Sequence, residues 1–154
     1  MTTQTEGNEV QLTAPYVLEY AYKRTLGPIL SQFFTAMRDG KVLGAKLGDG
    51  RVMVPPTEYD PDTGDELTEL VEVGDVGVVT TWSWVAKPRR VHPLDTPFGW
   101  ALIKLDGADT AMLHVVDAPS ADAMKTGMRV KARWRGERVG FMTDIECFEP
   151  EVSE

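Results

Sequence analysis

The chain has 154 residues, 42% of them hydrophobic, which is enough for one compact domain or for one domain with a small appendage. Its formal net charge of −8 argues against a protein that tracks nucleic-acid phosphates, because such proteins usually present a basic face. The single cysteine, Cys147, excludes an internal disulfide framework and fits a reducing compartment. No apolar stretch approaches the length that spans a bilayer, so we expect a cytoplasmic protein.

The N-terminal part predicts a flexible tail over residues 1–15, a short extended segment and a helix. Residues 17–24 alternate apolar and polar side chains, as a strand does, with a helix from Tyr16 as the alternative. Gly27 and Pro28 then begin a helix, because proline at the first helical position loses no hydrogen bond. Gly40 is placed for a left-handed C-terminal cap.

This helix carries one apolar stripe with two adjacent phenylalanines, Phe33 and Phe34. One reading packs the stripe onto the domain that follows. The other reading is a protein partner, since large apolar patches on soluble domains usually mark interfaces. For the second reading we expect the partner contact to include Ile29, Phe33, Phe34 and Met37.

Residues 46–64 have the turns of a zinc ribbon without its cysteines. One glycine-containing turn leads into an apolar strand, a Pro-Pro break and a second turn closed by glycine. A working ribbon holds its metal with C-x-x-C twice. The four corresponding positions are Leu47, Gly50, Asp60 and Thr63, and the first two offer no metal ligand. We therefore predict a vestigial site with no metal and no cofactor.

The free energy that a structural zinc would supply to folding must then come from elsewhere. Our hypothesis is that hydrogen bonds from Asp60 and Thr63 and packing by Leu47 and Tyr59 replace it.

From residue 70 onward the pattern is all-β, with a short helix that Ser120 can cap. Five strands with a helix after the third is the order of an OB-fold. Trp82 and Trp84 share one face of the first strand, and we expect them at the ribbon–barrel junction or in a partner contact. The strand candidates are residues 76–85, 100–105, 111–116, 128–134 and 140–148.

These features together resemble a family of small acyl-CoA-associated proteins, domain of unknown function 35, which join an N-terminal helix, a rubredoxin-like zinc ribbon and an OB-fold. The resemblance implies a mainly β chain: helix and metal-free ribbon over 16–69, a five-stranded OB-fold barrel over 70–149 and an acidic tail over 150–154. It rests on residues 27–40, the turn 50–52 with Pro55-Pro56, and residues 74–79, 97–107 and 127–130.

The same resemblance implies an accessory subunit without catalytic residues of its own. Its partner would be a thiolase-like or lipid-transfer-protein-like aldolase or acyltransferase in a hetero-oligomer, serving acyl-CoA metabolism such as steroid side-chain or lipid degradation. The loop between the first two barrel strands holds Arg89, Arg90 and His92, which are the candidates to face acyl-CoA, although a plain solvated loop also explains them.

Two alternatives belong to other classes. Aromatic side chains on an OB sheet can stack on bases, which would make the chain a single-stranded nucleic-acid-binding module, against its acidic charge. A stand-alone enzyme would use His92 with Asp95 as an acid–base pair. The other histidine, His114, alternates within a predicted strand and is expected to be a satisfied structural side chain.

Overall fold

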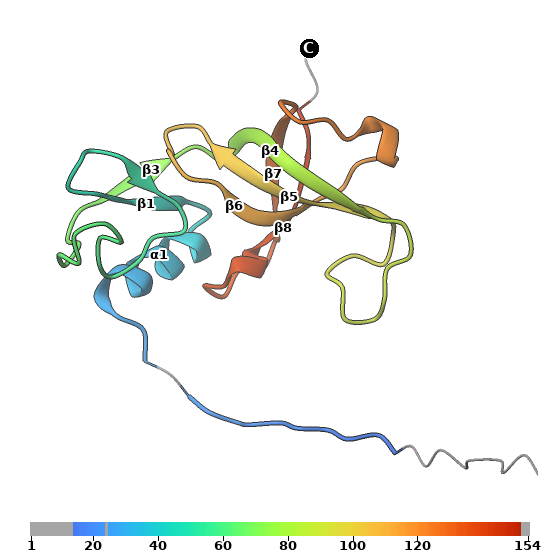
Figure 1. Ribbon diagram of the computed structural model, residues 1–154, viewed down its shortest axis with the longest axis horizontal. Helices are drawn as coiled ribbons and strands as arrows, with labels where there is room; N and C mark the ends of the chain where they lie inside the picture. Colours follow the sequence, from blue (N-terminus) through green and yellow to red (C-terminus); the bar gives the residue numbers. More distant parts are fainter. Residues whose placement is uncertain (1–13, 24, 152–154) are drawn as a thin grey trace, which may run out of the picture.

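The computed structural model describes residues 14–23 and 25–151. A helix and a three-stranded sheet lie at one end of the molecule, and a closed five-stranded barrel lies beside them (Figure 1). The predicted fold class, a mainly β chain with one N-terminal helix and an OB-type barrel, is confirmed. Among the described helices, none is long and apolar enough to cross a membrane.

The helix α1 (Pro28–Arg38) begins and ends where the glycines predicted. Its first N–H groups have no partner inside the helix, and the carboxylate of Glu58 accepts hydrogen bonds from those of Ile29 (3.1 Å) and Leu30 (2.9 Å). Gly27 lies so close to this carboxylate that a Cβ there would come within 2.2 Å of Glu58 Cδ. At the other end, Gly40 takes the positive φ of 75° that a left-handed cap requires.

Three antiparallel strands follow as the sheet of the ribbon: β1 (Val42–Lys46), β2 (Val52–Met53) and β3 (Leu70–Val73), in the order β2-β1-β3. The sequence-based division placed residue 70 at the start of the barrel. The pairing of β3 with β1 instead puts residues 70–73 in the ribbon sheet, and the barrel begins with the next strand. We call the helix and this sheet the ribbon lobe.

The barrel closes in the order β4-β5-β6-β8-β7, with β7 pairing back to β4. This is the strand order of an OB-fold. The short helix η1 (Ala121–Ala123) follows the third barrel strand, and η2 (Met142–Asp144) precedes the last one. The strands are β4 (Val76–Val85), β5 (Phe98–Leu105), β6 (Met112–Val116), β7 (Arg129–Trp134) and β8 (Ile145–Pro150).

The core runs through both lobes. Phe33 and Met37 on α1 are fully buried and pack in one cluster with barrel side chains such as Ile103 and Phe148. Ile29 is buried in a second cluster with Leu47 and Leu67 of the ribbon lobe. The apolar stripe of the helix is therefore largely core.

This burial corrects the partner-contact prediction for Ile29, Phe33 and Met37. Their side chains are at most 1% exposed, so a partner cannot reach them in this fold. Phe34 lies on the edge of the stripe and stays partly exposed. Trp82 and Trp84 are also half-buried, packed against the main cluster. For these three side chains the partner contact stays a prediction.

Candidate functional sites: the ribbon turns and the barrel face

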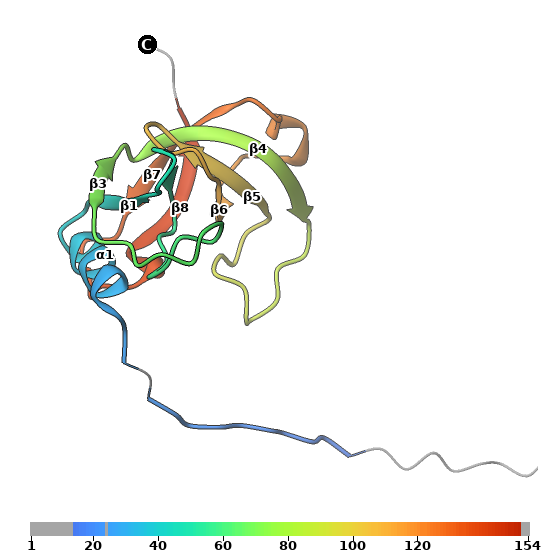
Figure 2. The ribbon, with the colours of Figure 1, turned by 60° about the vertical axis from the view of Figure 1, so that its left-hand side comes forward.

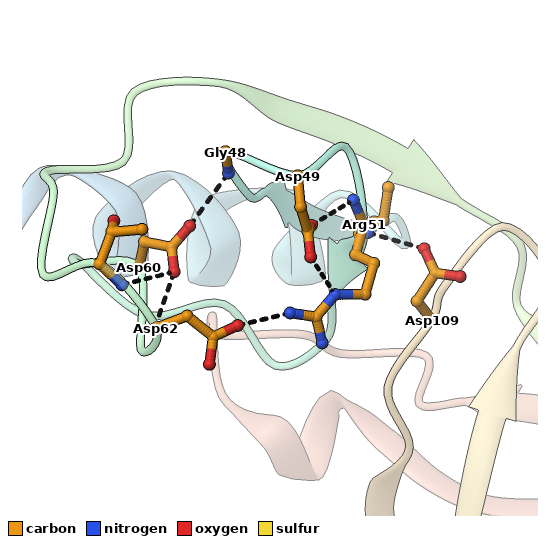
Figure 3. Close-up of polar contacts among 8 residues, drawn as sticks. Gly48, Asp49, Arg51, Asp60, Asp62 and Asp109 are labelled. Atoms are coloured by element: carbon orange, nitrogen blue, oxygen red, sulfur yellow. Dashed lines mark hydrogen bonds and ion pairs between the residues drawn. The ribbon is translucent and has the colours of Figure 1, made fainter.

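The carboxylate of Asp60 joins the two turns that a metal ion would join in a working ribbon (Figure 3). One oxygen, Oδ2, accepts a hydrogen bond from the N–H of Gly48 in the first turn at 3.0 Å. The other, Oδ1, accepts from the N–H groups of Asp62 (2.9 Å) and Thr63 (3.4 Å) in the second turn. Asp60 is only 4% exposed, so its carboxylate occupies the space between the turns.

Arg51 links the same turns from the solvent side. Its guanidinium pairs with Asp49 (2.5 Å) in the first turn and with Asp62 (2.5 Å) in the second (Figure 3). These groups are about half exposed, and exposed ion pairs contribute little to stability. From the barrel, Asp109 accepts a hydrogen bond from the N–H of Val52 at 2.8 Å and ties the ribbon lobe to the β5–β6 turn.

The hypothesis on what replaces the metal holds in part. Asp60 makes the expected hydrogen bonds, and Leu47 is buried in the core of the ribbon lobe. Thr63 also makes the expected bond: its hydroxyl accepts a hydrogen bond from the N–H of Asp65 (3.2 Å) and donates to the Asp65 carboxylate (2.8 Å), within its own turn. The prediction that Tyr59 packs in the ribbon is wrong, because that side chain is 60% exposed.

The donor set does not fit a structural zinc. Hydrogen bonds from the backbone N–H groups of Gly48 and Asp62 lower the pKa of Asp60 below its usual value, so the side chain is an anion that both turns already use. Leu47 and Gly50 supply no ligand atom at their positions. Across residues 14–23 and 25–151, three or more metal-ligating side chains do not come together anywhere. Metal analysis of the purified protein is the measurement that tests the metal-free state.

A cavity of about 220 Å³ opens on the barrel between the β4–β5 loop and the β7–β8 loop. OB-folds bind ligands on this face, between these two loops. Its walls are mostly apolar, and Arg135 and Glu146, whose charged groups are 4.0 Å apart, line it as well. The apolar lining comes from Pro93, Trp100, Leu113, Val115, Met142 and Ile145.

His114 also lines this cavity, with 9% of the residue exposed. Its Nε2 lies 3.4 Å from the carbonyl oxygen of Met142, and its ring packs edge-on against Phe148. Burial lowers the pKa of His114, so the ring is neutral at pH 7, with Nε2 donating. Nδ1 has no partner among the described residues, so the prediction of a satisfied histidine holds for one nitrogen only.

The three candidates to face acyl-CoA lie in the β4–β5 loop but do not line this cavity. Arg89 and Arg90 are exposed. His92 closes a local turn: its Nδ1 accepts from the N–H of Arg89 at 3.0 Å, and its own N–H donates to the Arg89 carbonyl at 2.8 Å. The ring then packs against Phe98. An acyl-CoA contact of Arg89, Arg90 and His92 stays a prediction.

Sequence reasoning missed the carboxylate that shapes the β7–β8 loop. Asp144 is 1% exposed, and its oxygens accept hydrogen bonds from the N–H groups of Val139 (3.0 Å), Gly140 (2.7 Å) and Phe141 (3.1 Å). Burial opposes the charge, but these hydrogen bonds outweigh it and lower the pKa of Asp144. The signal was an aspartate inside a predicted strand, where aspartate is depleted. Residues 140–144 are accordingly a loop with η2.

Comparison with known proteins agrees with this architecture. Residues 70–135 match the family model described as the ChsH2 C-terminal OB-fold domain. A protein of unknown function from the DUF35 family of Sulfolobus solfataricus is 24% identical, with a TM-score of 0.56 over 69% of this chain and 78% of that chain. A chain of the Ltp2–ChsH2(DUF35) aldolase is 19% identical, with a TM-score of 0.61 over 84% of this chain and 100% of that chain. No curated protein matches this chain.

The barrel order and the lobe beside it define an OB-fold protein with a ribbon-like N-terminal lobe. The family model then narrows the class. Residues 70–135 match the OB-fold domain of that model, and the two similar structures share the fold, in agreement with the DUF35 resemblance that the sequence predicted.

Proposed function

We propose that this chain is an accessory subunit that binds a thiolase-like aldolase or acyltransferase. The observation that carries the proposal is the likeness to a chain of the Ltp2–ChsH2(DUF35) aldolase, which is matched over 100% of its length. The name of that structure gives two proteins and one activity. A hetero-oligomer with a thiolase-like subunit is the arrangement that we expect for this chain.

The chemistry of the described residues supports binding more than catalysis. Cys147 is fully buried, and burial raises the pKa of its thiol to about 12, so it is not a thiolate nucleophile at neutral pH. The Nδ1 of His92 already accepts a hydrogen bond from the N–H of Arg89. Among the described residues, no hydrogen bond joins His92 to Asp95. The nucleophile would then belong to the partner.

Within such a complex we assign this chain to acyl-CoA metabolism, such as steroid side-chain or lipid degradation. The cavity on the barrel face is a suitable wall for an acyl group, because it is mostly apolar. The chain would shape the acyl-CoA channel or stabilise the active form of its partner.

The test is co-expression with a thiolase-like protein from the same organism, beginning with any whose gene lies beside the gene for this chain. We expect the two proteins to elute as one heteromer from a sizing column, and acyl-CoA cleavage or transfer to require both. If the two proteins elute separately from the column, the proposal is contradicted. Turnover of acyl-CoA by the isolated chain, abolished by His92→Ala, would favour the stand-alone enzyme instead.

A further inference from the structure

The segment before α1 carries a dense group of exposed apolar side chains. We call residues 16–23 the arm. Five of these eight residues are large and apolar, and their side chains are 62–84% exposed. The arm runs away from the folded body in both views (Figures 1 and 2). The five are Tyr16, Val17, Leu18, Tyr20 and Tyr22.

Nothing in the described part of the chain covers the arm. None of the hydrogen bonds found there involves residues 16–23. Segments that remain unpartnered are usually poor in aromatic residues, whereas tyrosine is enriched at protein–protein interfaces. The composition of the arm is therefore that of a segment which becomes buried against another protein.

A second apolar group lies where the arm meets the body. We call Leu26, Phe34, Val139 and Phe141 the junction patch. The rings of Phe34 and Phe141 are 6.4 Å apart, and Leu26, Phe34 and Val139 line one shallow groove. Val139 and Phe141 are 68% and 62% exposed. The patch continues the apolar surface of the arm onto the folded domain.

The junction patch exists because the two lobes are docked together. Phe34 comes from α1, and Val139 and Phe141 come from the barrel loop that Asp144 holds. Gly140 lets this loop approach the helix: its φ is +88°, and a Cβ there would lie 3.0 Å from the carbonyl oxygen of Phe34. A partner on this patch would contact both lobes at once.

Two arginines border the patch, although the chain as a whole carries −8. Arg38 lines the same groove, and Arg138 donates a hydrogen bond to the carbonyl oxygen of Arg38 (3.0 Å), which puts two arginines beside the patch. No ion pair of Arg38 or Arg138 occurs within the described residues. Such a rim fits a partner with an acidic border around its apolar groove, because complementary charge steers association.

We propose that the arm and the junction patch form one docking surface for the thiolase-like subunit. This inference rests on the proposed function. The arm lies along an apolar groove of the partner, and the patch with its arginine rim seats beside it. A second copy of this chain fits less well, because it would bring together two chains of net charge −8.

The experiment measures the affinity of the thiolase-like subunit for variants of the full chain. The arm variant is Tyr20→Ser with Tyr22→Ser, and the patch variant is Phe141→Ser. Tyr59→Ser and Val91→Ser are matched controls, since these side chains are 60% and 82% exposed but lie elsewhere. We expect about tenfold weaker binding for the arm and patch variants, as for truncated aromatic interface residues, and less than about twofold for the controls.

Each outcome decides the inference. If wild type binds and the arm and patch variants bind equally well, the docking surface is wrong while the proposed function stands. If wild type does not bind the subunit at all, both proposals fail. If the isolated chain dimerises in sedimentation equilibrium and the arm variant does not, the occupant is a second copy and the inference is overturned.

Two further measurements distinguish a variant that folds poorly from a variant that has lost its docking surface. The arm variant alters no packed side chain, so its urea midpoint must match wild type. Hydrogen exchange of the wild-type complex is expected to slow at the amides of residues 16–23, for which the described part of the chain shows no hydrogen bond. Unchanged exchange there in a stable complex also overturns the inference.

Discussion

Asp60 accepts hydrogen bonds from backbone N–H groups of both ribbon turns, and these N–H groups belong to the stretches where a ribbon has cysteines. A carboxylate can serve two turns because its two oxygens accept on different sides. The buried side chain of Leu47 adds apolar packing at another of the old ligand positions. The Asp60 carboxylate thus links the two turns, and the Leu47 side chain packs beneath them, at positions where a zinc ribbon has metal ligands.

We expect Asp60→Asn to lower the urea midpoint of unfolding with little change in slope. An amide has one acceptor oxygen, and its NH₂ group would face backbone donors of one turn. The folded pKa of Asp60 lies below the unfolded value of about 3.9. Its contribution is therefore complete above about pH 4 and is lost as the pH falls through the folded pKa, so the gap between variant and wild type should close in acid.

Asp62→Asn is the matched control in the same turn, because its exposed side chain bonds only Arg51. If Asp62→Asn lowers the urea midpoint of unfolding as much as Asp60→Asn does, the linking role of Asp60 is contradicted. We also expect a chelator to move neither midpoint, because Leu47 and Gly50 supply no metal ligand.

At the scale of elements, the start of α1 depends on a residue far along the chain. The carboxylate of Glu58 takes the place of a capping side chain that Gly27 cannot supply. The helix is thereby fastened to the second ribbon turn as well as to the core. Gly27 has a second role, because its missing side chain leaves room for the carboxylate.

We predict that Gly27→Ala destabilises the protein by about 1–2 kcal/mol, the usual cost of losing a helix N-cap. The new Cβ would lie 2.2 Å from Glu58 Cδ and would push the carboxylate off the helix. Gly136→Ala is the control, because a Cβ at that position meets nothing within 4 Å. Urea unfolding of both variants measures the effect, and equal midpoints would show that Glu58 does not hold the helix.

On the scale of the whole molecule, the two lobes share one core. Phe33 on α1 is fully buried among barrel side chains, and Asp109 of the barrel bonds the ribbon strand β2. The barrel loop that contacts α1 is held by the buried Asp144. These contacts imply that ribbon and barrel unfold together.

Phe33→Ala tests this coupling. We expect a loss of about 3–5 kcal/mol, because the change leaves a cavity in the shared core. All four tryptophans lie in barrel strands, so their fluorescence reports the barrel although the mutation is in the helix. Thr35→Ala, on the exposed side of α1, is the control. A barrel midpoint that Phe33→Ala leaves unchanged would mean that the lobes fold independently.

The sequence by itself determined the elements of this protein and the class of its fold. Pro28 and Gly40 mark the helix ends, strand periodicity predicts β4 with its observed bounds, and two turns without cysteine predict a ribbon without ligands. These features depend on neighbours within a few residues, whose spacing is legible in a single chain.

Only the tertiary structure decided which partner each buried group found. It placed Phe33 in the barrel core, gave Asp60 its N–H donors in both turns and joined residues 70–73 to the ribbon sheet. It also left the arm and the junction patch uncovered. Such pairings join residues that are distant along the chain, and local pattern says nothing about which of many possible contacts closes with the best packing and hydrogen bonds.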